Sequence, residues 1–178
     1  GGNWLERGVM APSGLVWSGR PLRDDALIAL ATDRFPPDMD YASEINQAAE
    51  SLVGELVRRL VAGAMLVVDY GLPQREYFAP DRDGGTLLAH YRHRATTDPF
   101  VWPGLADLTT HVDFTAMAVA GVDAGLTLAG YATQAAFLVN AGVLDVLHEV
   151  GDPTSPAYLR AASAVQKLLG PAEMGETF

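Results

Sequence analysis

Carboxylate and imidazole side chains stand at two places where an α/β protein would do chemistry. Asp69 follows an apolar run that begins at Ala64, and ligands of open α/β sheets lie beyond the carboxyl ends of such strands. His111 and Asp113 precede an apolar helical pattern. An imidazole can carry a proton near pH 7, and a neighbouring carboxylate can orient it. Asp69, His111 and Asp113 are therefore our candidate catalytic residues.

Each candidate has a structural alternative. Asp69 can end the strand or cap a neighbouring helix. Asp113 is a good N-cap for a helix over residues 114–124, and we favour that role over catalysis. For His111 the sequence leaves both interpretations open.

A basic cluster, His90-Tyr91-Arg92-His93-Arg94, stands out in an otherwise acidic chain. The spacing of its two histidines can ligate a metal on a helix, but no third ligand lies nearby and the arginines repel a cation, so we expect no metal. Arg92 and Arg94 carry planar guanidinium groups, which can bind a carboxylate through two parallel hydrogen bonds. A solvated loop is an equal alternative for this segment.

The composition excludes several function classes. The chain has 178 residues, no cysteine and a formal charge of −10, which argues against nucleic acid as a partner. It contains no apolar stretch long enough to span a membrane, so we expect a cytoplasmic protein that does not bind membranes. Glycine fingerprints for dinucleotides or phosphates and a hydrolase nucleophile motif are absent from the sequence.

The elements that would position the candidates are those of an α/β fold. The apolar run 64–71 does not alternate, which predicts a strand covered on both faces, and a second strand is expected over 126–131. The pattern over residues 4–18 predicts a β-hairpin. Ser43 is the expected N-cap of a helix over 44–61. Further helices are expected over 24–32, 114–124, 134–141, 144–150 and 157–169, with Thr133 as a cap.

Several segments together resemble one family. They are Leu66-Val67-Val68-Asp69-Tyr70-Gly71, Asp83-Gly84-Gly85-Thr86-Leu87, Tyr91-Arg92-His93-Arg94, Pro103-Gly104-Leu105-Ala106-Asp107-Leu108-Thr109, His111-Val112-Asp113-Phe114, Thr133-Gln134-Ala135-Ala136-Phe137-Leu138 and Met174-Gly175-Glu176-Thr177-Phe178. Their order and spacing are similar to those of the MidA-like class I S-adenosyl-L-methionine-dependent methyltransferases. Mitochondrial members of this family assist complex I assembly by methylating an arginine of a subunit.

The resemblance implies the C-terminal portion of a Rossmann-like methyltransferase sheet with a β-hairpin insertion and a helical C-terminal part. It divides a single domain into a hairpin insertion (1–20), a helix and buried strand (43–71), a long loop (72–112) and a βα and helical region (113–178). The cofactor would be S-adenosyl-L-methionine. Its binding loop is expected upstream of Gly1, so this segment alone would be inactive.

The resemblance also implies a protein substrate methylated at arginine. Carboxylates would hold the guanidinium, with Asp69 ahead of Asp113, and His111 would help to shape the acceptor pocket. The implied substrate-binding residues are Tyr70, Tyr91, Arg92, His93 and Gln134. A homodimer is a further possible state of the protein. The alternative function is a non-catalytic assembly or interaction module with a methyltransferase-like fold.

Overall fold

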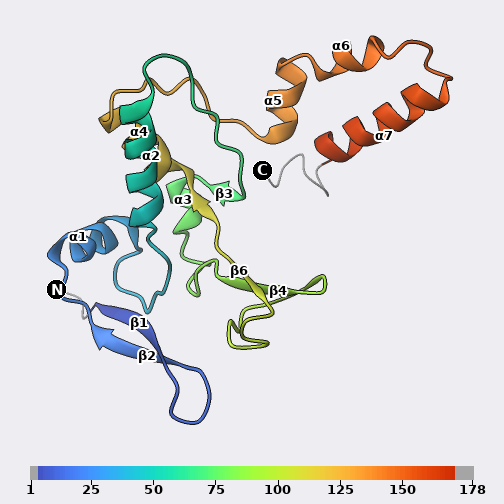
Figure 1. Cartoon of the computed structure of the whole chain (residues 1–178). Coiled ribbons are helices and arrows are strands. Elements are labelled where there is room, and N and C mark those ends of the chain that lie inside the picture. The colour runs from blue at the N-terminus through green and yellow to red at the C-terminus, as the bar shows by residue number, and fades with distance from the viewer. Residues whose placement is uncertain (1–3, 171–178) are drawn as a thin grey trace. The chain divides into compact units, whose positions relative to one another are not determined.

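The computed structural model describes residues 4–170, which divide into two compact units (Figure 1). The first unit consists of the residues up to Ala49 together with Leu72–Asp113. The second consists of Glu50–Gly71 together with the residues from Phe114 onward. None of the described helices is both long enough and apolar enough to cross a membrane.

The first unit begins with the predicted hairpin, which is confirmed. Strands β1 (Leu5–Met10) and β2 (Val16–Pro21) pair in antiparallel register, and Val9 lies opposite Trp17. Because side chains alternate across a strand, the two share one face of the hairpin. Val9 is 54% exposed and Trp17 43% exposed.

Helix α1 (Asp25–Arg34) follows the hairpin and begins where a capping residue stands. The side chain of Asp24 accepts hydrogen bonds from the backbone N–H of Ala26 and Leu27. These bonds satisfy donors that an isolated helix leaves unpaired. The helix expected over 24–32 is therefore confirmed, with a slightly later end.

A three-stranded antiparallel sheet lies within the segment expected to be a long loop. Strands β4 (Leu88–Tyr91), β5 (Arg94–Thr96) and β6 (Asp107–Thr109) stand in the order β5-β4-β6. Arg92 and His93 form the two-residue turn between β4 and β5, with φ angles of 47° and 62°. Both residues adopt the left-handed conformation that this turn requires and that glycine or asparagine usually supplies.

An aromatic cluster forms the core of the first unit. The ring of Phe35 lies 5.6 Å from that of Trp4 and 5.2 Å from those of Tyr41 and Phe78, measured between centroids. Tyr77 and Phe78 are 3% and 5% exposed. They stand at the end of the short helix α3 (Gln74–Tyr77), which follows strand β3 (Gly71–Leu72); β7 (Val112–Asp113) ends the unit.

The carboxylate of Glu44 ties this core to the turn that precedes β4. The backbone N–H of Thr86 donates to both carboxylate oxygens of Glu44, at 3.0 and 3.2 Å, and that of Leu87 donates to one of them at 3.1 Å. The hydroxyls of Thr86 and Tyr77 donate to the same carboxylate at 3.1 and 3.4 Å. Bonds to an ionised acceptor are the stronger class of hydrogen bond.

The network extends to the segment before β7. The backbone N–H of His111 donates to the hydroxyl oxygen of Thr86 at 3.0 Å, and Thr86 is only 7% exposed. Glu44 therefore joins, directly or through Thr86, three stretches that lie far apart in the sequence. We call Glu44, Tyr77, Thr86, Leu87 and His111 the Glu44 network.

The second unit is helical. Helix α2 (Gln47–Arg59) buries Val53 and Val57, and α4 (Phe114–Asp123) buries Ala116 and Gly121. A Cβ atom at Gly121 would lie 3.8 Å from a methyl carbon of Val53, so the two helices pack closely there. The remaining helices are α5 (Gln134–Asn140), α6 (Val143–His148) and α7 (Pro156–Leu169).

Two helix boundaries show how capping sets element ends. Thr133 caps α5 as predicted, by accepting a hydrogen bond from the backbone N–H of Ala136. Ser43 was expected to cap the helix over 44–61, and that prediction is wrong. The helix begins at Gln47, and the side-chain oxygen of Asn46 accepts from the N–H of Ala49 instead.

The two strands expected over 64–71 and 126–131 do not form as predicted. Residues 64–70 and 126–131 have no regular secondary structure in this chain, and only Gly71 of the first run lies in a strand. Leu66 is 66% exposed and Leu128 58% exposed. A strand covered on both faces needs paired neighbours and covering helices, so a correct apolar pattern does not make a strand by itself. The segment Met174–Phe178 lies outside the described residues.

Substitution of Gly85 tests the Glu44 network. Gly85 has φ +80°, and a Cβ there would lie 2.5 Å from Oε1 of Glu44. Gly104 has nearly the same φ, +78°, and a Cβ there would meet nothing within 4 Å. Gly85→Ala and Gly104→Ala therefore share the backbone cost, about 1 kcal/mol. We expect Gly85→Ala to lose about 2 kcal/mol more, as it must displace a hydrogen-bonded carboxylate.

Urea unfolding of the two variants measures this difference. Equal losses of stability would show that the carboxylate of Glu44 moves aside at no cost, and the network would then not hold the turn.

Candidate functional site

Asp69 lies at the end of the apolar run, on an exposed stretch of the second unit. One of its carboxylate oxygens accepts a hydrogen bond from the backbone N–H of the next residue, Tyr70, at 2.7 Å. A carboxylate offers about four acceptor positions, so this local bond leaves capacity for a ligand. Tyr70 is itself 47% exposed. The structure thus shows both side chains at the surface, and their roles stay predictions.

His111 belongs to the first unit and is fixed through its backbone by the Glu44 network. Its ring nitrogen Nδ1 is buried and has no hydrogen-bond partner among residues 4–170. Burial lowers the pKa of His111 below its ordinary value, the charge of Arg82 lowers the pKa further, and Glu44 acts in the opposite direction. The imidazole is therefore neutral at pH 7, the state in which it can accept a proton.

Asp113 lies two residues further on and takes part in an ion pair. Its Oδ2 is 4.0 Å from Nη1 of Arg34, and the two side chains are only 10% and 9% exposed. The pair joins the last residue of α1 to the end of β7. This contact is structural, and neither the predicted cap of α4 nor a catalytic role is tested by it.

The basic cluster forms the tip of the β4–β5 hairpin. The ring of Tyr91 lies 4.9 Å from that of Trp102, and the guanidinium carbon of Arg92 lies 5.3 Å from the centroid of the Tyr91 ring. Arg92 and His93 are exposed. The segment for which a solvated loop was one alternative is a tight turn whose arginine lies over an aromatic ring, a favourable contact for a cation. The other alternative, binding of a carboxylate by Arg92 and Arg94, stays a prediction.

Gln134 has a defined contact in the second unit. Its side-chain nitrogen Nε2 donates to the carbonyl oxygen of Leu168 at 3.0 Å, which fastens α5 to α7. A substrate-binding role for this amide stays a prediction beside the structural one.

Glu44, Tyr77 and Thr86 were not among the site residues that the sequence predicted. Burial raises the pKa of Tyr77 to about 12, so its hydroxyl stays protonated and can donate to the carboxylate. One signal was present in the sequence: Gly84-Gly85 before Thr86 permits a close backbone approach. The partner of that approach lies 41 residues upstream of Gly85, so no local pattern could identify it.

The described strand-to-helix junctions β2–α1, β3–α3 and β7–α4 contain no glycine. The place where S-adenosyl-L-methionine binds stays a prediction. The part of the chain that the structure describes also holds no group of three or more His, Cys, Asp or Glu side chains that could bind a metal ion.

A family model matches residues 1–132 and is described as "Putative S-adenosyl-L-methionine-dependent methyltransferase". Two curated relatives are similar to the chain, both called "Protein arginine methyltransferase NDUFAF7, mitochondrial". The protein from Danio rerio is 32% identical over 140 residues, covering 76% of this chain and 31% of the relative. The protein from Mus musculus is 32% identical over 145 residues, covering 76% and 30%.

Two solved structures from Burkholderia thailandensis are also similar. One is described as a "likely methyl transferase" bound to S-adenosylhomocysteine; it is 46% identical, with a TM-score of 0.85, over 98% of this chain and 46% of that one. The other is a native structure of an uncharacterized protein, 46% identical with a TM-score of 0.88 over 98% and 47%. The chain thus spans about half the length of these structures and about a third of the curated relatives.

The match over residues 1–132 and the identity to both curated relatives agree with the α/β methyltransferase-like fold of the structural neighbours. The expected resemblance is therefore confirmed: the chain belongs to the MidA-like family of S-adenosyl-L-methionine-dependent methyltransferases.

Proposed function

We propose that the complete protein transfers a methyl group from S-adenosyl-L-methionine to an arginine side chain of a protein. The observation that carries this proposal is the 32% identity to two relatives that are both named as protein arginine methyltransferases. The cofactor supplies an activated methyl group, so the protein has mainly to align the acceptor and exclude water.

Within this proposal, the chain contributes to the acceptor side of the reaction. A carboxylate holds a guanidinium by parallel hydrogen bonds, and exposed Asp69 is suited to that task. His111, which is neutral at pH 7, can take up the proton that a methylated guanidinium loses. The Glu44 network fixes the backbone of His111 and so limits where its imidazole can lie.

The same proposal covers the conformation of two apolar segments in the complete protein. Residues 64–70 and 126–131 present large apolar side chains to solvent, among them Val68 at 56% and Tyr131 at 57% exposure. Such exposure is costly for a folded chain. We infer that both segments are strands of a Rossmann-like parallel sheet in the complete protein, where neighbouring strands pair with them and helices cover them.

Methylarginine formation tests the function. The complete protein is incubated with methyl-labelled cofactor and protein from its own cells, and the labelled product is hydrolysed to amino acids. We expect label on arginine. Asp69→Asn should lower the rate at least about tenfold, since an amide cannot pair ionically with a guanidinium. Asp123→Asn, at an exposed aspartate of the same unit, should leave the rate unchanged.

Label on lysine or on nucleic acid would contradict the proposed acceptor, and no label in any fraction would favour the non-catalytic module. If Asp69→Asn kept both the rate and the acceptor affinity, Asp69 would not hold the guanidinium.

Titration of His111 tests its protonation state. Because its folded pKa is lowered, folding stability from this group is present above the unfolded value of about 6.5 and is lost as the pH falls through the folded pKa. Proton NMR of the imidazole should give a pKa below about 6.5. Arg82→Gln should raise it, because it removes a nearby positive charge. Arg75→Gln, at an exposed arginine of the same unit, is the control, and an equal effect of both variants would contradict the assignment.

A further inference from the structure

Arg82 carries a partly buried guanidinium in the segment between α3 and β4. Its side chain forms no ion pair with any residue from 4 to 170, the exposed neighbours Asp81 and Asp83 included. Its backbone is held on both sides. The N–H of Arg82 donates to the carbonyl oxygen of Ala79 at 2.9 Å, and its carbonyl oxygen accepts from the N–H of Gly85 at 3.0 Å. Charges that are drawn out of water are ordinarily paired, so an anionic partner would stabilise this guanidinium.

Two polar side-chain atoms of the same unit are buried without a hydrogen-bond partner among residues 4–170. They are the hydroxyl oxygen of Ser43 and Nδ1 of His111. The large majority of buried polar atoms in proteins have a partner, so each of these two groups would gain from one.

Backbone and side-chain contacts place Ser43 beside the same segment. The N–H of Ala42 donates to the carbonyl oxygen of Asp83 at 2.9 Å. On the other side of Ser43, the carboxylate of Glu44 accepts from the N–H of Thr86 at 3.0 Å. Because the residues before and after it are tied to positions 83 and 86, the serine hydroxyl lies close to this turn.

His111 lies at the same turn. Its backbone N–H donates to the hydroxyl oxygen of Thr86. Burial lowers the pKa of the imidazole most, and the positive charge of Arg82 lowers it further, so the guanidinium lies near the ring. Arg82, Ser43 and His111 therefore surround one place in the first unit.

The three groups need the same kind of partner. A guanidinium has only donors, a serine hydroxyl has one donor, and an imidazole donates from Nδ1 in one tautomer and when protonated. Glu44 cannot serve all of them, because its carboxylate already accepts from two backbone N–H groups and two hydroxyls. These bonds use its about four acceptor positions. The missing partner is thus an anion with free acceptor oxygens.

We propose that Arg82, Ser43 and His111 form a subsite for a carboxylate group, the Arg82 subsite. The two oxygens of a carboxylate match the planar fork of a guanidinium, and the hydroxyl and the imidazole can each donate to one of them. An acidic side chain of a protein ligand and the amino-acid end of the methyl donor both present this group. The subsite goes beyond methyl transfer to arginine and does not depend on that function.

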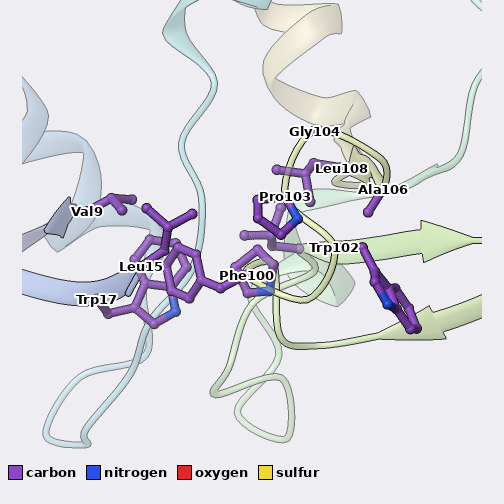
Figure 2. A pocket seen from close by; sticks show the side chains of 11 residues that line it. Val9, Leu15, Trp17, Phe100, Trp102, Pro103, Gly104, Ala106 and Leu108 are labelled. Atoms are coloured by element: carbon purple, nitrogen blue, oxygen red, sulfur yellow. The ribbon is translucent and has the colours of Figure 1, made fainter. Parts of the chain in front are cut away.

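The apolar groove of the first unit is a separate feature (Figure 2). It has a volume of about 240 Å³ and lies between the β1–β2 hairpin and the loop that joins β5 to β6. Trp17 and Phe100 meet there edge to face, with ring centroids 5.0 Å apart. None of the residues that line the groove carries a charge. A carboxylate would lose its hydration there without gaining a charged partner, so we expect it not to bind in the groove.

Acetate is the smallest probe of the Arg82 subsite. It is titrated into the full chain at constant ionic strength, and the imidazole signals are followed by NMR as a function of pH. We expect saturating acetate to raise the pKa of His111 by at least about 0.5, because a nearby anion favours the charged imidazole. Acetamide, which has the same shape without the charge, should not change it. The exposed His148 of the second unit should keep its pKa in both.

Two variants and their matched controls assign the groups. The side chains of Arg82 and Ser43 form no hydrogen bond or ion pair with residues 4–170, so Arg82→Gln and Ser43→Ala should fold. We expect Arg82→Gln to weaken acetate binding at least about tenfold and Ser43→Ala at least about threefold. Arg75→Gln and Ser13→Ala, at exposed positions of the same unit, should change it less than about twofold.

The source of the carboxylate follows from competition. Displacement of acetate by the peptide acetyl-Gly-Glu-Gly-amide would assign the subsite to an acidic side chain, and displacement by S-adenosylhomocysteine would assign it to the methyl donor. Displacement by neither would overturn the proposal. So would equal effects of acetate and acetamide, an equal shift at His148, or acetate binding that survives Arg82→Gln. Loss of this inference would leave methylarginine formation untouched, and absence of methylarginine would leave the subsite in place.

Discussion

The carboxylate of Glu44 is the constraint on which the first unit depends. Two backbone N–H groups and two hydroxyls donate hydrogen bonds to it. The hydroxyl oxygen of Thr86 in turn accepts a hydrogen bond from the backbone N–H of His111. Buried donors without an acceptor cost about 1–3 kcal/mol each, so loss of this one acceptor would affect several groups together. The turn before β4, the end of α3 and the segment that carries the candidate imidazole therefore share one anchor.

Local patterns in the sequence predicted the local structure well. The hairpin, the Asp24 start of α1 and the Thr133 cap follow from alternation and from residue types that satisfy free N–H groups. The strands expected over 64–71 and 126–131 failed because strand formation depends on partners that an apolar pattern cannot specify. Glu44 was missed for a related reason, since its partners Tyr77 and Thr86 lie 33 and 42 residues away.

The family identifies the cofactor, whereas the structure describes the surroundings of two candidate residues. The family model and a neighbour bound to S-adenosylhomocysteine indicate S-adenosyl-L-methionine as the methyl donor. Within the chain, Asp69 is exposed in the second unit, and His111 is held through its backbone in the first unit. The roles of both residues toward an acceptor belong to the proposed function.

Amide hydrogen exchange at Thr86, Leu87 and His111 tests the central claim most directly, because each N–H has its acceptor in the Glu44 network. The network predicts slow exchange at all three amides, and Glu44→Gln should speed it at all three together. The exposed Glu76→Gln should leave the three rates unchanged. Fast exchange in the unsubstituted protein, or a Glu44→Gln effect confined to Thr86 and Leu87, would contradict a shared anchor for the turn and for His111.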